Sequence, residues 1–153
     1  MKRIMKTLDE IINRQDYVRV NKALVERANE LAEIFANKFY ELVGAWDERE
    51  DHYPPFLINV NGHEYCAKYN IRGNGIDKWT DGFRFVLFEW WNGDDRYCSK
   101  SLNCTQYGTE ASYYDYVNFL NDAKDILAKL DESETKMVKD AENAIENSKN
   151  ISL

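Results

Sequence analysis

The sequence predicts an α+β fold, in which a four-stranded antiparallel meander sheet at about residues 56–102 is flanked by helical segments on both sides in the chain. Three observations predict it. The Asn61-Gly62 pair separates two β-prone runs and is a strong signal for a type I′ hairpin turn. The run FRFVLFEWW at 83–91 has the aromatic content of a strand. The segments before and after the sheet repeat apolar residues at the three- and four-residue steps of an amphipathic helix.

A two-residue turn fixes the register of the first hairpin. Val60 is expected opposite His63, with further pairs of Ile58 with Tyr65 and Phe56 with Ala67.

The third strand does not alternate, which predicts a central strand covered on both sides. Residues 96–102 should return as a weaker edge strand. On the third strand, Phe83, Phe85, Leu87 and Trp91 should point one way and Val86, Phe88 and Trp90 the other.

The N-terminal helical segment begins with a capping box formed by Thr7 and Glu10. Residues 7–45 could form one helix or two, because no Pro or Gly before Gly44 marks a break. Gly44 is expected to end the helical segment. The apolar stripe contains Val20, Leu24, Ala28, Leu31, Phe35, Phe39 and Leu42, and Glu26, Glu30 and Glu33 fall on the opposite side.

The C-terminal helix is expected to be capped by Thr109 or Ser112 and to reach Leu130. Residues 133–147 form a weaker amphipathic piece, which could be an extension, a packing helix or a helix that uses a partner chain. Residues 148–153 are expected to be disordered. The predicted buried side contains Tyr113, Tyr116, Phe119, Leu120, Ala123, Leu127 and Leu130, with Asp115, Asn118, Asp122 and Asp125 on the reverse.

Composition and charge exclude some classes of protein, such as membrane-spanning chains and general nucleic-acid binders. The 153 residues are expected to form a single domain, residues 1–153, with a net charge of −7 concentrated on the helical segments. No apolar run approaches the ~20 residues of a membrane span, and three cysteines suit a reducing cytoplasm. An acidic chain lacks the cationic surface of a general nucleic-acid binder, so direct binding to nucleic acid is not expected.

No motif identifies catalytic, cofactor or metal residues. The best metal pair, His63-x-x-Cys66, is excluded because strand positions three apart face opposite sides. His52, Cys98 and Cys104 have no supporting spacing, and the glycine-rich loop at 72–82 is expected to be a long hairpin connection.

Two surfaces could bind a partner. One is the aromatic sheet with Trp79 and Trp91, which would be open if both helical segments packed on the other face. The alternative, which we favour, is that its rings fill the core or that the two helical segments sandwich the sheet. The other is a set of helical carboxylates whose spacing resembles that of phosphates along a nucleic acid: Asp115, Asp122, Asp125, Glu26, Glu30 and Glu33.

The leading hypothesis is therefore a small acidic, non-enzymatic binding protein. It would act on a protein partner, such as an enzyme that handles nucleic acid, as a stoichiometric inhibitor or immunity factor. Phage anti-defence proteins of the anti-CRISPR kind and nucleic-acid mimics are examples of this class. The alternatives are a small enzyme using His63 or a cysteine, and a chaperone-like acidic dimer. The sequence leaves the oligomeric state open, a homodimer included.

Overall fold

The computed structural model describes residues 8–47, 53–69, 83–90, 97–103 and 111–152, with side chains from Tyr17 onward. The α+β prediction is confirmed, and the N-terminal segment is one helix of 36 residues rather than two. The elements, in order, are α1 (Leu8–Val43), β1 (Ile58–Val60), β2 (His63–Tyr69), β3 (Phe83–Trp90), β4 (Tyr97–Ser101) and α2 (Tyr113–Ser148).

The four strands form one antiparallel sheet in the order β1-β2-β3-β4. The predicted turn is confirmed, since Asn61 and Gly62 have φ angles of 53° and 85°, and Val60 pairs with His63 as expected. The expected pairing of Phe56 with Ala67 is wrong, because β1 begins only at Ile58. Trp46 takes that place beside β2: its N–H donates to the Ala67 carbonyl at 2.8 Å and its own carbonyl accepts from the Tyr69 N–H at 2.9 Å.

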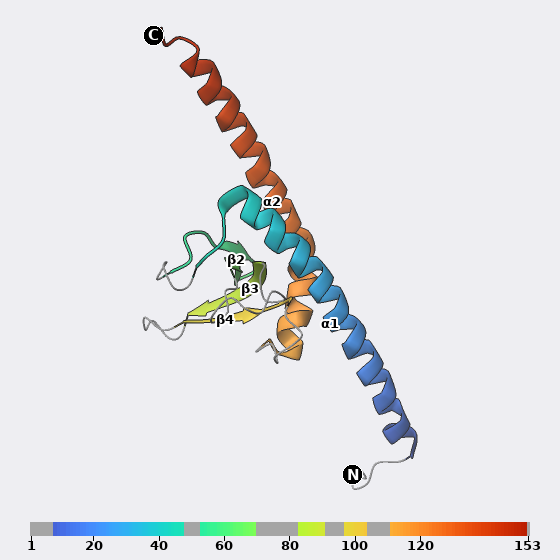
Figure 1. The fold of residues 1–153 in the computed structure, drawn as a ribbon. Helices are drawn as coiled ribbons and strands as arrows, with labels where there is room; N and C mark the ends of the chain where they lie inside the picture. The colour runs from blue at the N-terminus through green and yellow to red at the C-terminus, as the bar shows by residue number, and fades with distance from the viewer. Residues whose placement is uncertain (1–7, 48–52, 70–82, 91–96, 104–110, 153) are drawn as a thin grey trace, which may run out of the picture.

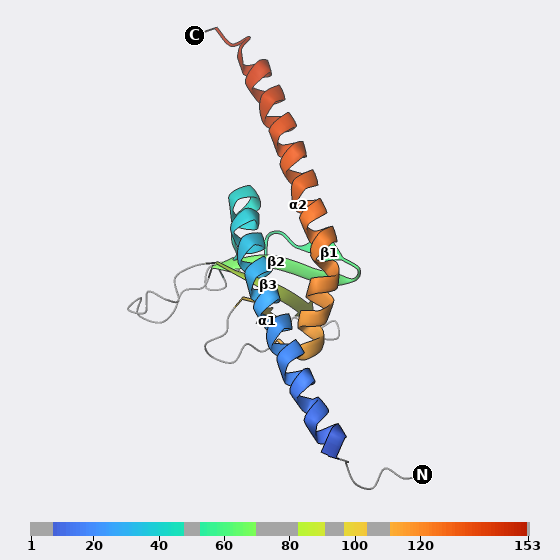
Figure 2. The ribbon, with the colours of Figure 1, turned by 90° about the vertical axis from the view of Figure 1, so that its right-hand side faces the viewer.

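Both helices pack on the same face of the sheet (Figures 1 and 2). Phe85, at the centre of β3, is fully buried on this face. Its ring lies 5.7 Å from Phe35 of α1, 5.7 Å from Phe119 of α2 and 5.6 Å from Tyr65 of β2, measured between centroids. One aromatic ring thus joins both helices to the sheet.

The second face of β3 is covered without a helix. Gly44, with φ of 88°, ends α1 as predicted, and the chain then carries Trp46 to this face. Trp46 is buried, with its ring 5.8 Å from Phe88, which also stacks on Tyr97 at 5.2 Å. The prediction that β3 is covered on both sides is therefore confirmed, although the second cover is built from aromatic side chains.

We call the sheet and the parts of the helices that pack on it the body. The N-terminal end of α1 and the C-terminal end of α2 project from the body in opposite directions (Figure 1). On α2 the last buried residue is Leu130, and every residue of 131–148 is exposed except the half-buried Ser133. We call residues 131–148 the C-terminal arm and residues 8–23, which precede the buried part of α1, the N-terminal arm. The segment 133–147 is therefore a continuous extension of α2.

The hairpin turn yields a first prediction. Gly62→Ala should lower the free energy of unfolding by about 1 kcal/mol, because an L side chain is strained at positive φ. No heavy atom lies within 4 Å of the added Cβ, so the loss would come from the backbone alone. Gly62→Asn, which tolerates this conformation, should lose less. Urea unfolding measures both, and equal stability of Gly62→Ala and the parent chain would contradict the turn assignment.

Candidate functional site

The most distinctive polar group in the structure is the carboxylate of Asp122, on the sheet-facing side of α2. Its side chain is only 4% exposed. Oδ1 accepts from Asn61 Nδ2 at 2.8 Å, and Oδ2 accepts from the Tyr65 hydroxyl at 2.7 Å and pairs with His63 Nδ1 at 2.7 Å. The hairpin turn and the start of β2 supply all three partners, so one carboxylate ties the β1–β2 hairpin to α2.

These hydrogen bonds set the protonation states of the cluster. Burial by itself would raise the pKa of Asp122, but the hydrogen bonds from Asn61, Tyr65 and His63 outweigh it, and its pKa lies below the ordinary value. Burial raises the pKa of Tyr65 far above its ordinary value, and the hydrogen bond to Asp122 raises it further. Tyr65 is therefore a neutral donor to an ionised Asp122 throughout the neutral range.

The pair of His63 and Asp122 has the arrangement of groups that can transfer a proton. A buried carboxylate bonded to Nδ1 fixes the orientation of the imidazole and leaves Nε2 to exchange a proton. The His63 side chain is 34% exposed, and among the described residues none hydrogen-bonds Nε2. It borders an open hollow of about 350 Å³ lined by Gly62, His63, Glu64, Leu87, Phe88, Glu89 and Trp90.

A second carboxylate, Asp115, is held at the N-terminus of α2. It forms a capping box with Ser112: the Asp115 N–H donates to Ser112 Oγ at 3.2 Å, and Asp115 Oδ2 accepts from the Ser112 N–H at 2.8 Å. Lys100 Nζ lies 3.4 Å from Asp115 Oδ2 and 3.6 Å from Glu89 Oε2. Burial works against the charged form of Lys100, but these two carboxylates outweigh it and raise its pKa. The group links β4 to the first turn of α2.

The expectation that Asp115 and Asp122 face solvent is wrong, since both are buried. Asp122 follows Phe119 by three residues and precedes Ile126 by four, so it lies on the same helical stripe as these two apolar residues. The sequence carried a signal for Asp115 as well, because Ser112 three residues earlier forms the capping-box pattern. The observed buried side contains Asp115, Tyr116, Phe119, Asp122, Ala123, Ile126 and Leu130, whereas the predicted members Tyr113 and Leu127 are exposed.

The other predicted partner-binding residues divide into two groups. Glu26, Glu30, Glu33 and Asp125 are exposed, as expected, and Glu30 forms a solvent-exposed ion pair with Arg27 at 3.1 Å. Trp79 and Trp91 lie outside the described residues.

The aromatic face of β3 fills the core, as in one form of the alternative we favoured; the other form, a sheet sandwiched between the two helical segments, is wrong, because both helices pack on the same face. Phe85 and Leu87 are buried beneath the helices, and Leu57 and Phe83 are half-buried at its margin. The rings of this face are therefore not available as a partner surface.

Two of the three cysteines, Cys66 and Cys98, lie among the described residues, and both are free thiols. Burial raises the pKa of the Cys66 thiol to about 12, which keeps it protonated at neutral pH. Cys98 is half-buried, with its Sγ 3.9 Å from Glu89 Oε2. His63 and Cys66 lie on opposite faces of β2, as predicted, and the described parts of the chain contain no cluster of three or more His, Cys, Asp or Glu residues arranged to hold a metal. His52 and Cys104 lie outside the described residues.

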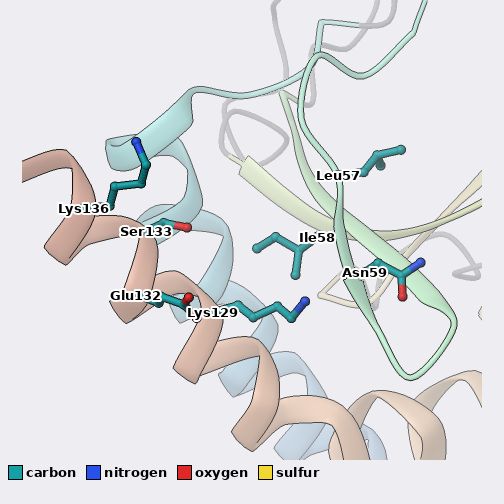
Figure 3. Close-up of a pocket in the computed structure, with 7 residues that line it drawn as sticks. All are labelled: Leu57, Ile58, Asn59, Lys129, Glu132, Ser133 and Lys136. Atoms are coloured by element: carbon teal, nitrogen blue, oxygen red, sulfur yellow. The ribbon is translucent and has the colours of Figure 1, made fainter. Parts of the chain in front are cut away.

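A hollow lies at the root of the C-terminal arm, between β1 and α2 (Figure 3). Its volume is about 380 Å³, and an apolar hollow of about 130 Å³ beside it shares Leu57, Ile58 and Ser133 and adds Phe39, Leu42 and Phe56. The first hollow is lined by Leu57, Ile58 and Asn59 from the β1 segment and by Lys129, Glu132, Ser133 and Lys136 from α2.

Beyond this root, the C-terminal arm carries an apolar stripe that the described parts of the chain leave uncovered. Met137, Val138 and Ile145 are 41%, 51% and 60% exposed, and Ala141 and Ala144 lie between them on the same side of the helix. Met137, Ala141 and Ala144 continue, at three- and four-residue steps, the side of α2 that is buried at Ile126 and Leu130. Val138 and Ile145 lie at the edge of this side, in line with Leu127, which is 41% exposed. The packed face of α2 therefore runs past the body into solvent.

Comparison with known proteins found no matching family model, no matching curated protein and no matching solved structure. Within the described residues, neither helix contains a stretch long and apolar enough to cross a membrane.

The Asp122 cluster yields a second prediction. Asp122→Asn should lower the free energy of unfolding at pH 7 by about 1–3 kcal/mol, because it disturbs a buried, charge-assisted network. A carboxylate whose pKa is lowered by folding stabilises the fold above its unfolded pKa, about 4, and this contribution is lost as the pH falls through the folded value. The variant should therefore lose less stability than the parent chain between about pH 5 and pH 2.

Asp125→Asn is the matched control, since Asp125 is exposed one turn away on the same helix. It should stay within about 0.5 kcal/mol of the parent chain. Denaturant unfolding across this pH range measures all three proteins. Identical pH profiles for Asp122→Asn and Asp125→Asn would show that the cluster does not stabilise the fold.

Proposed function

We propose that this chain is a non-enzymatic binding protein that acts by stoichiometric association with another protein chain through its C-terminal arm. The biological role that fits such a protein is that of an inhibitor or immunity factor, of which phage anti-defence proteins are one kind. The observation that carries the proposal is the apolar stripe of the C-terminal arm, which continues a packed helix face but is exposed at Met137, Val138 and Ile145.

The geometry of the stripe suits helix-mediated recognition. Apolar residues at three- and four-residue steps are the anchors by which an amphipathic helix enters a groove or pairs with another helix. The arm is about 27 Å long, from 18 residues at the helical rise of 1.5 Å per residue. That length presents five turns of one face to a partner, and the hollow beside Leu57 and Ile58 adds a recess at its root.

The shape of the chain supports the same proposal. The C-terminal arm projects beyond the sheet, and its apolar side chains are exposed (Figure 1).

The charge of the arm would assist association. Residues 131–148 contain six acidic and two basic side chains, so the arm would steer a cationic partner surface towards the stripe. The nucleic-acid-mimic form of the proposal would have to use Glu26, Glu30, Glu33 and Asp125, because Asp115 and Asp122 are buried.

A second candidate is an enzyme in which His63 acts as a general acid or base. The observation that favours it is the 2.7 Å contact of His63 Nδ1 with the buried Asp122, beside a hollow of about 350 Å³. In this candidate Asp122 orients the imidazole and Nε2 exchanges a proton with the substrate. The Cys66 thiol has no nucleophilic role in it, because burial raises its pKa to about 12.

The binding proposal is tested with charge introduced on the stripe. Met137→Glu combined with Ile145→Glu should reduce capture of the partner from the native cell at least tenfold, because two charges would have to be buried. Glu is a good helix former, so α2 should remain intact by circular dichroism. Thr135→Glu with Asn143→Glu adds the same charge on the opposite side of the arm and should capture as the parent chain does. Equal capture by the two double variants would contradict the proposal.

The enzyme candidate predicts a different dose dependence. Below one equivalent, a stoichiometric binder affects only the matching fraction of its target, whereas an enzyme continues with time until all of the target has reacted. In the enzyme, His63→Gln should reduce the rate by about 10²–10⁴-fold. The control is Asp125→Asn, because Asp125 is exposed and is not among the residues that line the hollow. An effect that saturates at one equivalent and survives His63→Gln would exclude catalysis by this pair.

A further inference from the structure

We infer that the hollow between β1 and α2 binds an extended segment of the partner protein, which pairs with the outer edge of β1 and carries an acidic residue two positions away from an apolar one. This inference rests on the proposed function, because it gives the form of the partner's chain at the root of the C-terminal arm. We call the hollow of about 380 Å³ at this place the β1 groove. A free strand edge, an apolar recess and an available lysine support the inference.

The first feature is the free edge of β1. This strand lies at the border of the sheet and pairs only with β2. In an antiparallel hairpin with a two-residue turn, the residues that flank the turn exchange both backbone hydrogen bonds, so Val60 and Ile58 direct their backbone groups towards β2. Asn59 lies between them and directs its N–H and carbonyl away from β2. No described residue hydrogen-bonds to these two groups, which makes this edge a template for a further strand.

The β1 groove lies at this edge. It is lined by three consecutive residues, Leu57, Ile58 and Asn59. Successive side chains of a strand point to opposite faces, so a hollow that touches three in a row meets the strand at its edge. No residue of β2 is among the described residues that line it, so this is the edge that faces away from β2. Figure 3 shows Ile58 extending from β1 towards α2 and Lys129 extending from α2 towards β1.

The second feature is the apolar recess beside the groove. This hollow of about 130 Å³ shares Leu57, Ile58 and Ser133 with the groove, and its other walls are apolar. An apolar cavity of about 150 Å³ holds a group the size of benzene, so the recess suits one aliphatic or aromatic side chain. The walls that it does not share with the groove are Phe39, Leu42, Val43, Phe56 and Leu130.

The third feature is the charge of the groove. Lys129, Lys136 and Glu132 are the charged residues among those described that line it. Lys136 is already paired with Asp140, at 2.7 Å between Nζ and Oδ2. Lys129 has no hydrogen bond or ion pair with any described residue. A carboxylate of the bound segment would therefore pair with Lys129, which is available to it.

The spacing of these features fits an extended chain. Side chains two positions apart in a strand lie on the same face, about 6.6–6.8 Å from each other. Lys129 and Ser133, which lines the recess, are four residues apart on α2, or about 6 Å along the helix. One side chain of the bound segment can therefore meet Lys129 while the side chain two positions away enters the recess.

The experiment selects peptides from a random library displayed on phage, with the full chain as bait, and measures the selected peptides by fluorescence polarisation. The selected sequences should carry an acidic residue two positions from an apolar one. Lys129→Glu should weaken their binding at least about tenfold, because it places like charges together. Lys124→Glu is the control, because Lys124 is exposed on another side of α2 and does not line the groove. If no selected peptide has this pattern and depends on Lys129, the inference is overturned.

The strand pairing is tested at Asn59. Asn59→Pro removes the outward N–H and leaves the hydrogen bonds between β1 and β2 in place, and an edge strand tolerates Pro at such a position. It should weaken peptide binding at least about tenfold, whereas Asn59→Thr, which changes the side chain but keeps the N–H, should bind as the parent chain does. Circular dichroism and urea unfolding check that both variants are folded. Equal binding by the two variants would contradict the strand pairing.

Peptides methylated on alternate backbone nitrogens give a second test that leaves the protein unchanged. Successive N–H groups of a strand point to opposite edges, so only one of the two alternate sets faces β1. One methylated peptide should lose binding and the other should keep it. Equal binding of the two methylated peptides would show that no strand is added.

The two proposals fail differently when the variants are compared for capture of the same partner. If Met137→Glu with Ile145→Glu loses the partner while Lys129→Glu and Asn59→Pro capture it, the groove inference is wrong and the proposed function stands. If the reverse holds, the groove inference stands and the role of the arm in the proposed function is wrong. If every variant captures as the parent chain does, both are wrong.

Light scattering on the full chain tests a different occupant, β1 of a second copy. The parent chain is expected to be monomeric through this edge. A dimer that Asn59→Pro abolishes and Asn59→Thr keeps would overturn the inference, because the edge would then be closed by the chain itself.

Discussion

The length of the two helices relative to the sheet is the constraint on which the rest of the structure depends. Each helix has 36 residues, or about 54 Å at 1.5 Å per residue. The longest strand has eight residues, or about 27 Å. Because the helices share one face of this sheet and run in the same direction with a stagger, each covers it with one end and projects with the other. The two projecting arms, and the association through the C-terminal arm that we propose, follow from this mismatch.

Inside the body, two kinds of contact hold the helices in place. Apolar burial centres on Phe85, whose ring contacts both helices, and it supplies most of the favourable free energy of such a core. The Asp122 cluster is directional instead. A buried carboxylate is costly unless it is hydrogen-bonded, and the three partners of Asp122 all come from the β1–β2 hairpin. This requirement fixes the rotation of α2 about its own axis, and with it the direction in which the stripe of the arm faces.

Much of the fold could be predicted from the sequence, because its signals are local. The Asn61-Gly62 turn, the register at Val60 and His63 and the end of α1 at Gly44 each depend on residues close in the chain. The placement of Asp115 and Asp122 failed because their partners are distant: the contact of Asp122 with Tyr65 spans 57 residues. Hydropathy assigns an aspartate to solvent, and only the folded arrangement shows that Asn61, His63 and Tyr65 replace the water. The same limit applies to the arms, since periodicity identifies an amphipathic helix without showing where the sheet beneath it ends.

The position of Trp46 has a consequence for how this molecule can meet others. β1 pairs with only the first part of β2, which would leave the backbone groups beyond Tyr65 as a template for a strand from another chain. The bridge from Trp46 to Lys68 occupies that stretch, and the buried indole anchors it. The carbonyl of Ala67 and the N–H of Tyr69 are thus already hydrogen-bonded and are not open to a strand from another chain.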